Sequence, residues 1–343
     1  MSFQPSGRVF ILGAGASAFA GYPLANGLFG FIHQTDSLEV KAKEIASQIL
    51  PKLSDAEVQF TRHIVRNTNG VANLEELLTY LDLYHSFPGT IFDVTPWTET
   101  DSAAIRRVIT DKFMDYQYDL SQRVWRSGAS ANPISNIAKA WARRLQRGDV
   151  ILSFNWDILH EIIFWRSGLW SYKDGYGFQC GTQGQREEST KLLLLKLHGS
   201  VNWVQDEEHE PISEIANIPD FFPNSRDWDS RTHFDQAQID SGRKLVLPTY
   251  LKDVSSNKVL LDIWTKAYFF IAHARELIVL GYSLNRVDHP ARLLFGTALS
   301  ENTALRRVTV VSPGGTEWPV FVDHLGKEMT NVRQKFEDWA VGT

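Results

Sequence analysis

The sequence predicts an α/β protein with a Rossmann-like, doubly wound parallel sheet and a large helical insertion. Its apolar residues gather in short, continuous runs separated by helical or loop segments, which is typical of strands buried on both faces. The first run, from Arg8 to Leu12, ends directly at a glycine-rich turn, as a central strand of such a sheet does. A chain of 343 residues exceeds the usual single domain, so we expect one α/β core domain, 1–343, with an elaboration inside it.

The expected elements follow one another along the chain. After the glycine-rich turn, residues 37–126 show helical signals, such as Asn73 as a cap before leucines at helical spacing, and we predict a helical insertion there. Another helix should follow Pro133. Further strands are expected at five apolar runs, 150–154, 192–197, 244–247, 277–280 and 308–311. With the first run these make six strands, while the polar stretch 205–243 indicates a long surface excursion.

Composition and charge limit the classes of function. With 43% apolar residues the chain can bury a sizeable core, which excludes global disorder. A formal charge of −5 provides no general basic field, so we expect no direct nucleic-acid binding. Cys180 is the only cysteine, which excludes an intramolecular disulfide and a multi-cysteine metal site. The longest apolar runs are too short to span a bilayer, so we expect a soluble, cytoplasmic protein.

A glycine-rich turn follows the first strand, where a phosphate-binding turn belongs; it comprises Gly13, Ala14, Gly15, Ala16 and Ser17. Glycines there let the backbone turn tightly and approach a pyrophosphate, while amides at the start of the next helix face its negative charge. The same residues would also suit a merely tight strand-to-helix turn. A dehydrogenase is disfavoured, because Asp36, the acidic residue expected about 20 positions later, follows no evident strand.

Polar residues follow two further strands. Asn155 and Asp157 come directly after the run 150–154 and should face the same crevice as the glycine turn, since ligands sit at the carboxyl ends of parallel strands. Asp157 would equally cap the helix that follows, whereas Asn155 is less easily explained by capping. His198, after the run 192–197, suits a general base, because the ordinary pKa of histidine lies near working pH. A lone histidine is usually structural, and its place at a third strand end is what favours a function.

Two more strand ends carry small residues, as the binding of adenosine or ribose needs. Gly281, Tyr282 and Ser283 follow the run 277–280, and Ser312 follows the run 308–311. Each of these segments alone is only a loop. Together, five strand ends with small or polar residues form a pattern that a purely structural interpretation does not require.

In this order and spacing, the Gly-Ala-Gly-x-Ser turn, the Asn-x-Asp and His-Gly strand ends and the Gly-x-Ser loop resemble the sirtuin superfamily. The resemblance covers most of the α/β core from Arg8 to Pro313 and leaves the helical insertion unmatched. It implies a sirtuin-like fold that binds NAD, with Asn155 and Asp157 bordering the ribose and nicotinamide and His198 as the catalytic base. The residues that it implies along the rest of the NAD molecule are Gly13, Ala14, Gly15, Ser17, Pro23, Leu24, Gly281, Tyr282, Ser283 and Ser312.

Two departures separate the chain from the protein deacylases of that superfamily. Their paired Cys-x-x-Cys zinc module is absent, and Gly-Tyr-Pro-Leu at residues 21–24 replaces their Gly-Ile-Pro-Asp-Phe-Arg segment. In both features the chain resembles the sirtuin-like NAD-hydrolase domains of bacterial antiphage defence proteins. That resemblance implies an NAD+ glycohydrolase that works without zinc and releases nicotinamide and ADP-ribose. It also implies a homo-oligomer and a companion defence protein such as an ATPase.

Three other functions stay open from the sequence. An NAD-dependent protein deacylase would cleave the same bond but transfer an acyl oxygen, and the missing zinc ligands count against it. A non-catalytic module that senses NAD or ADP-ribose would have no need to retain both Asn155 and His198. A dehydrogenase is the least favoured. For a hydrolase, the sequence leaves open whether the product is ADP-ribose itself or a cyclised form.

Overall fold

The computed structural model of the protein describes residues 3–24, 27–28, 99–126, 132–171, 175–178, 191–204, 243–245, 258–286 and 288–342. The greater part of the predicted insertion, residues 205–242 of the predicted surface excursion 205–243, and Cys180 lie outside the described residues. The division of the chain into one core domain and an insertion therefore stays a prediction. Within 99–126 the chain is helical, with α5 (Glu99–Ser121) continuing into a π-helical turn, η5 (Gln122–Arg126).

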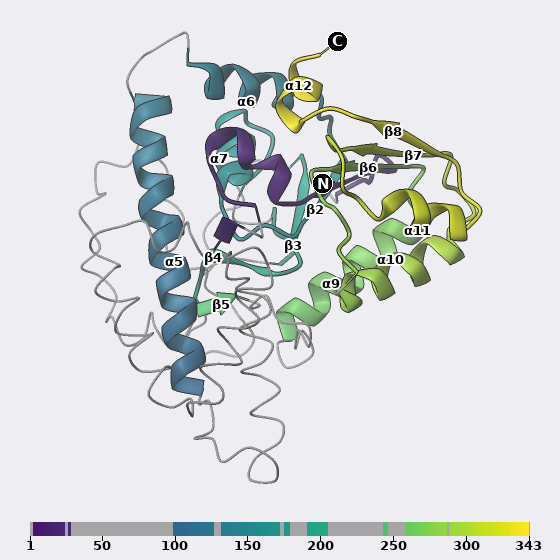
Figure 1. Ribbon diagram of the computed structural model, residues 1–343, viewed down its shortest axis with the longest axis horizontal. Coiled ribbons are helices and arrows are strands. Elements are labelled where there is room, and N and C mark those ends of the chain that lie inside the picture. Colours follow the sequence, from purple (N-terminus) through teal and green to yellow (C-terminus); the bar gives the residue numbers. More distant parts are fainter. Residues whose placement is uncertain are drawn as a thin grey trace.

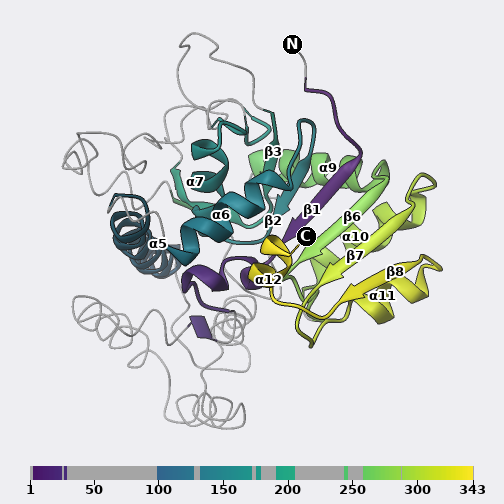
Figure 2. The same cartoon turned by 90° about the horizontal axis from the view of Figure 1, so that it is seen from above.

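A six-stranded sheet forms the centre of the molecule, and every neighbouring pair of its strands is parallel. The strands are β1 (Arg8–Leu12), β2 (Val150–Ser153), β3 (Leu193–Lys196), β6 (Glu276–Leu280), β7 (Arg307–Val311) and β8 (Met329–Val332). They lie in the order β3-β2-β1-β6-β7-β8, which is the Rossmann order 3-2-1-4-5-6 when the strands of this sheet are counted along the chain (Figures 1 and 2). The predicted doubly wound parallel fold is confirmed.

Helices cover both faces of this sheet (Figures 1 and 2). One layer contains α9 (Lys258–Ala272), α10 (His289–Glu301) and α11 (Trp318–His324). The other contains α6 (Pro133–Arg143), α7 (Leu159–Arg166) and α12 (Phe336–Val341). With helices on both sides, β1, β2, β3 and β6 are buried on both faces, which explains their continuous apolar sequences.

The helix predicted after Pro133 is confirmed as α6. Asn132 caps its first turn by accepting a hydrogen bond from the Ile134 amide at 2.9 Å, and Pro133 occupies a first-turn position that lacks an intrahelical partner. The helix buries Trp141, whose ring packs edge-on against Phe10 of β1 with centroids 5.4 Å apart. This contact fixes α6 on the sheet face that α7 and α12 share.

One predicted strand of the sheet is wrong, and one real strand was missed. The run predicted at 244–247 corresponds to β5 (Arg243–Leu245), which pairs antiparallel with β4 (Gly199–Val204) in a separate two-stranded sheet. The sixth parallel strand is instead β8, an edge strand with exposed side chains at Thr330 and Asn331. None of the four residues of β8 is buried, unlike those of β3 at the other edge, so β8 has no continuous apolar run and the pattern that identified the other strands did not reveal it.

The glycine turn contains one short 3-10 helix, η1 (Ala14–Ala16), and is followed by a second, η2 (Ala18–Ala20), where an ordinary α-helix was expected. Gly21 closes the second of them in the left-handed conformation, with φ of 91°. Among the helices that the structure describes, none is both long enough and apolar enough to cross a membrane.

Candidate functional site at the carboxyl edge of the sheet

The topology brings four strand ends together at one edge of the sheet. From β1 the chain proceeds outward through β2 to β3, then returns to β6 beside β1 and proceeds outward in the opposite direction. The carboxyl ends of β1 and β6 therefore flank the switch point, which is where ligands bind in open parallel sheets. The glycine turn follows β1 and Gly281 follows β6, so both lie at this point.

The glycines at the switch point allow the two turns to pack backbone against backbone. The Gly13 amide donates to the Leu280 carbonyl at 3.1 Å and the Gly15 amide to the Gly281 carbonyl at 3.0 Å. A Cβ atom on Gly15 would lie 2.8 Å from the Gly281 Cα, and one on Gly13 would lie 2.6 Å from the Tyr282 Cα. The glycine turn therefore has a structural requirement of its own, besides any approach of a phosphate.

Three of the predicted site residues form one buried hydrogen-bonded cluster. The Asn155 side-chain amide donates to the Gly13 carbonyl at 3.0 Å and to the Ser17 hydroxyl at 3.1 Å. The Ser17 side chain in turn hydrogen-bonds Asp157. Ser17, Asn155 and Asp157 are all buried, so the structure brings the end of β2 and the glycine turn after β1 into direct contact.

Asp157 lies one residue before the N-cap of α7, Ile158, and its side chain binds the start of that helix, which is close to the capping role that the sequence left open. Its Oδ1 accepts a hydrogen bond from the Leu159 amide at 3.1 Å, at the first residue of α7. Burial raises the pKa of the Asp157 carboxyl, while the Lys196 ammonium and the hydrogen bonds from Ser17 and the backbone act in the opposite direction. This hydrogen bond at the start of α7 explains the carboxylate without a ligand, and its place beside a substrate stays a prediction.

His198 occupies the turn between β3 and β4 and contacts the strand end of β2 through an aromatic ring. Its imidazole lies edge-on to Phe154, with ring centroids 5.1 Å apart. On another side, Phe154 stacks in parallel on Tyr282, with centroids 4.2 Å apart and an interplanar angle of 6°. The Tyr282 hydroxyl donates to Asp288 at 2.8 Å. A ladder of three rings thus joins the ends of β3, β2 and β6 and fixes the position of His198.

The turn that carries His198 is also held by its backbone. The Leu197 amide donates to the Ser153 carbonyl at 2.9 Å, and the Leu197 carbonyl accepts from the Trp264 indole of α9 at 2.8 Å. Gly199 then adopts a left-handed conformation, with φ of 70°, where the chain reverses into β4. His198 itself is buried at the edge of the sheet that Asn155 also occupies.

The remaining predicted residues lie around this edge with varied exposure. Ser283 is exposed, and its carbonyl accepts from the Glu317 amide at 2.9 Å. Ser312, after β7, is buried and donates to the Gly314 carbonyl at 3.0 Å. Ala14 and Pro23 are half-buried, and Leu24 is 49% exposed. Contact of these residues with a nucleotide stays a prediction.

A buried ion pair beneath this edge was not predicted from the sequence. Lys196 of β3 and Glu161 of α7 form an ion pair at 2.8 Å, with side chains only 1% and 3% exposed. Their positions inside the apolar runs 192–197 and 158–163 were the available signal, because a charged residue flanked by buried positions needs a buried partner. The pairing itself is tertiary and has no trace in local sequence.

His160 is a second buried polar residue that the sequence did not single out. Its Nδ1 accepts a hydrogen bond from the Trp141 indole at 3.2 Å. Burial lowers the pKa of His160 to about 3, with the nearby Lys196 ammonium acting in the same direction and a hydrogen bond with the Ala16 backbone acting against both. The imidazole is therefore neutral at physiological pH and serves the packing of α6 on α7.

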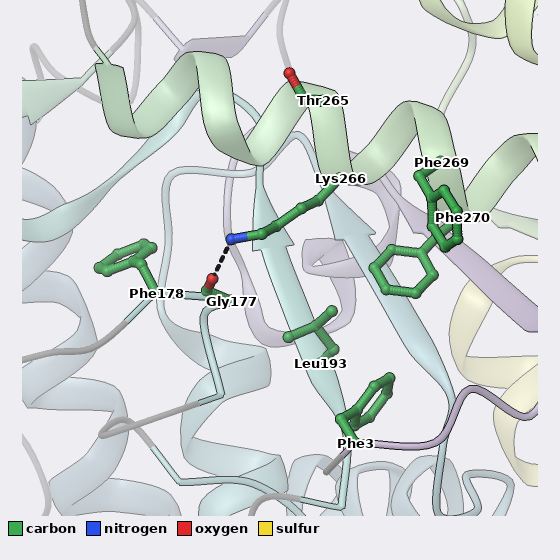
Figure 3. A pocket seen from close by; sticks show the side chains of 8 residues that line it. All are labelled: Phe3, Gly177, Phe178, Leu193, Thr265, Lys266, Phe269 and Phe270. Atoms are coloured by element: carbon green, nitrogen blue, oxygen red, sulfur yellow. Dashed lines mark hydrogen bonds between the residues drawn. The ribbon is translucent and has the colours of Figure 1, made fainter.

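An apolar cavity of about 590 Å³ lies away from this site (Figure 3). It is lined by Phe3, Gly177, Phe178, Leu193, Thr265, Lys266, Phe269 and Phe270. Leu193 is the first residue of β3, so the cavity lies at the amino end of the strand whose carboxyl end leads to His198. The Lys266 ammonium on its wall donates to the Gly177 carbonyl at 2.6 Å. The cavity offers none of the polar groups that the predicted chemistry requires.

In the part of the chain that the structure describes, no group of three or more histidine, cysteine or acidic side chains is arranged to hold a metal ion.

Comparisons with known proteins give only a structural similarity. No family model matches the sequence, and no curated protein matches it. Among solved structures, the chain is similar to a Sir2 homologue in complex with NAD, with 14% identity, a TM-score of 0.43 and coverage of 97% of this chain and 86% of the other. It is also similar to a mutant Sir2 homologue in complex with ADP-ribose, with 15% identity, a TM-score of 0.41 and coverage of 97% and 88%.

Proposed function

We propose that the protein is an NAD+ glycohydrolase, which cleaves the nicotinamide–ribose bond and releases nicotinamide and ADP-ribose. The observation that carries this proposal is the arrangement at the switch point of the sheet. Asn155 is hydrogen-bonded to the glycine turn at Gly13 and Ser17, and His198 follows the neighbouring strand at the same edge. A turn suited to a pyrophosphate, an amide and a candidate general base thus lie at one edge of the sheet, which supports the proposal. The sirtuin-like order of these motifs supports NAD as the nucleotide.

The chemistry requires little from the protein besides orientation and a proton acceptor. Nicotinamide leaves from a cationic centre as a neutral molecule, so cleavage of the C1′–N bond needs no general acid. The electron pair of that bond stays on the ring nitrogen, and the ribose acquires oxocarbenium character, which oriented dipoles and a nearby carboxylate stabilise. In this proposal Asn155 and Asp157 supply these groups. Water then attacks C1′, and His198 accepts its proton.

The resemblance to antiphage defence domains extends the proposal beyond the reaction. We propose that the activity depletes NAD during antiviral defence, in a homo-oligomer with a companion protein such as an ATPase. We further propose that the protein is cytoplasmic and needs no zinc. Native mass spectrometry of the purified protein tests the oligomer and the absence of a bound metal together.

Replacement of His198 and Asn155 tests the site. We expect His198→Ala to reduce nicotinamide release by a factor on the order of 10² to 10⁴, because the proton acceptor is lost. Asn155→Ala should cost a comparable factor through lost orientation. Residues that act as one catalytic unit give strongly non-additive losses, so the double variant should be about as inactive as either single variant.

Two controls accompany this measurement. His273→Ala removes an exposed histidine directly after the last residue of α9 and should leave nicotinamide release unchanged. Because Asn155 also holds the glycine turn, thermal unfolding of each variant is measured alongside activity. Full hydrolysis by a folded His198→Ala protein would remove the general-base role. Nicotinamide release that requires an acyl-lysine peptide would replace hydrolysis by deacylation.

A further inference from the structure

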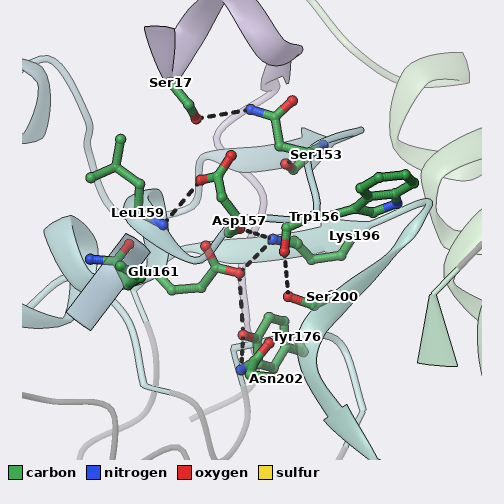
Figure 4. Close-up of polar contacts among 12 residues, drawn as sticks. Ser17, Ser153, Trp156, Asp157, Leu159, Glu161, Tyr176, Lys196, Ser200 and Asn202 are labelled. Carbon is green, nitrogen blue, oxygen red and sulfur yellow. Dashed lines mark hydrogen bonds and ion pairs between the residues drawn. The ribbon is translucent and has the colours of Figure 1, made fainter. Parts of the chain in front are cut away.

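The buried ion pair between Lys196 and Glu161 lies directly beneath the proposed site. Lys196 is two residues before His198, and Glu161 is four residues after Asp157 in the first turn of α7. Their nitrogen and oxygen atoms are 2.8 Å apart, and neither side chain reaches solvent. Figure 4 shows the pair between the Ser17–Asp157 cluster on one side and Tyr176 and Asn202 on the other.

Stability alone does not explain such a pair. The desolvation of two charges in a protein interior offsets most of their attraction, and replacement by apolar residues of similar volume is often neutral or stabilising. Burial raises the pKa of the Glu161 carboxyl, with the Lys196 ammonium opposing that shift, which reflects this desolvation cost. The further contacts of the two side chains therefore indicate what the pair contributes.

Lys196 connects its own strand to the loop that carries Asn155. Besides Glu161, its ammonium donates a hydrogen bond to the Asp157 backbone carbonyl. That carbonyl is at the end of the loop from Phe154 to Asp157. In this loop Asn155 contacts the glycine turn and Phe154 contacts the His198 ring. A buried ammonium with two fixed acceptors thus sets the distance between the end of β3 and the loop after β2.

Glu161 links α7 to β4, the strand that follows His198. Its Oε1 also accepts from the Tyr176 hydroxyl at 3.3 Å, and that hydroxyl accepts from the Asn202 amide of β4 at 3.2 Å. Lys196 precedes His198 and Asn202 follows it, so both strands that flank the histidine are hydrogen-bonded to one carboxylate network. Movement of Glu161 would release the His198 turn at both ends.

We propose that Lys196 and Glu161 are positioning residues, which hold the His198 turn and the Asn155 loop in one fixed relative geometry without touching the substrate. This inference rests on the proposed function for its catalytic consequence, but the geometric claim concerns the chain alone. A catalytic group that is misplaced by about 1 Å costs a factor on the order of 10² in rate. Loss of the pair should therefore lower kcat and leave the binding of NAD nearly unchanged.

The sharpest test is the apolar double variant Lys196→Met/Glu161→Leu. Each single replacement leaves a buried charge without its partner and should destabilise the protein, whereas the double variant contains neither charge and should fold with stability close to wild type. We expect its kcat for nicotinamide release to stay reduced on the order of 10²-fold, with KM for NAD near the wild-type value. Recovery of kcat together with stability would overturn the proposal.

A matched control uses an ion pair at the opposite end of the sheet. Arg307 and Glu276 pair at 2.7 Å across the first residues of β7 and β6, with side chains 60% and 33% exposed. The corresponding double variant, Arg307→Met/Glu276→Leu, should keep both kcat and KM. A similar loss in this control would attribute the effect to general loosening of the sheet, which would also overturn the proposal.

A second measurement separates this inference from the proposed function. The imidazole resonances of His198, assigned with His198→Gln, are compared by NMR between wild type and the Lys196→Met/Glu161→Leu protein. We expect the His198 resonance to shift or broaden while that of the exposed His324 stays in place. An unchanged His198 resonance would refute the positioning role. Failure of the wild type to release nicotinamide would refute the hydrolase proposal alone, because the NMR comparison requires no activity.

Discussion

The glycines at the switch point have two explanations, the close packing of two turns and the approach of a nucleotide. Gly13 and Gly15 were expected to admit a pyrophosphate and Gly281 to contact the adenosine half of NAD, and the structure shows that these glycines also let the two turns pack on each other. Gly281 has a φ of 62°, and a Cβ atom there would collide with the backbone of Gly15 and Ala16. Substitutions in this turn therefore disturb the fold as well as any nucleotide site.

We predict that Gly281→Ala lowers the free energy of unfolding by more than about 1 kcal/mol, because left-handed strain and the backbone collision add. Gly296→Ala is the matched control, since Gly296 lies inside α10 and its added Cβ would meet only the Phe321 ring, at 3.7 Å. Alanine is favoured over glycine in a helix interior, so the control should be neutral or stabilising by up to about 1 kcal/mol. Equal stability of the two variants in urea unfolding would contradict this account of the turn.

His160 should make the stability of the protein depend on pH. Its pKa is about 3 in the folded state and near the ordinary 6.5 in the unfolded chain. The unfolded state therefore binds a proton below pH 6.5 that the native state refuses, so stability falls as pH falls through the window from 6.5 toward 3. Between pH 7.5 and 5.0 this amounts to about 2 kcal/mol.

The test compares wild type with His160→Asn by urea unfolding at pH 7.5 and 5.0. The raised pKa values of Asp157 and Glu161 act with the opposite sign, because the native state takes up those protons more readily, but they are present in both proteins. We expect wild type to lose about 2 kcal/mol more than the variant over this interval. Identical losses would show that His160 is not held neutral by burial.

At the scale of elements, the short helix α12 braces the glycine turn. Phe336 stacks on Phe19 of η2 with centroids 5.4 Å apart and lies edge-on to Trp141 of α6 at 5.6 Å. Arg144, after α6, donates to the Ala340 carbonyl at 3.0 Å. Residues near the end of the described chain are thus packed against the turn that follows its first strand.

We predict that Phe336→Ala destabilises the protein by about 3 to 5 kcal/mol, since a nearly fully buried aromatic ring is removed from between two layers. Val341→Ala, in the same helix but 58% exposed, should change stability by less than about 0.5 kcal/mol. Thermal unfolding of both variants measures the difference. A small effect of Phe336→Ala would mean that α12 contributes little to this part of the core.

The elements also show how far sequence analysis reaches. Five of the six parallel strands were predicted, because burial on both faces leaves a continuous apolar run in the sequence. The edge strand β8 leaves no such run, and the three residues of β5 are too short to show which sheet they join. At the site, Asn155 and Ser17 lie close together as predicted and share a hydrogen bond, because both follow strands that the apolar runs identify. The Lys196–Glu161 pair was not predicted, because only the folded chain brings its members together.

At the scale of the whole molecule, the order of the strands divides the parts of the site between the two halves of the sheet. The sheet order places β1 and β6 at the centre, with the glycine turn and Gly281 between the two halves of the fold. The candidate general base, the amide and the ion pair beneath them all belong to the β1–β2–β3 half. The β6–β7–β8 half contributes Ser283 and Ser312, which the proposal assigns to the adenosine side of NAD.

The central claim is hydrolysis of NAD at this edge, and product analysis tests it most directly. The purified full chain is incubated with NAD alone, and the products are identified by mass spectrometry, with the folded His198→Ala protein as the blank. We expect nicotinamide and ADP-ribose to accumulate in equal amounts with wild type and to be nearly absent with the variant. Intact NAD after incubation with folded wild-type protein, or the appearance of reduced nicotinamide, would contradict the account.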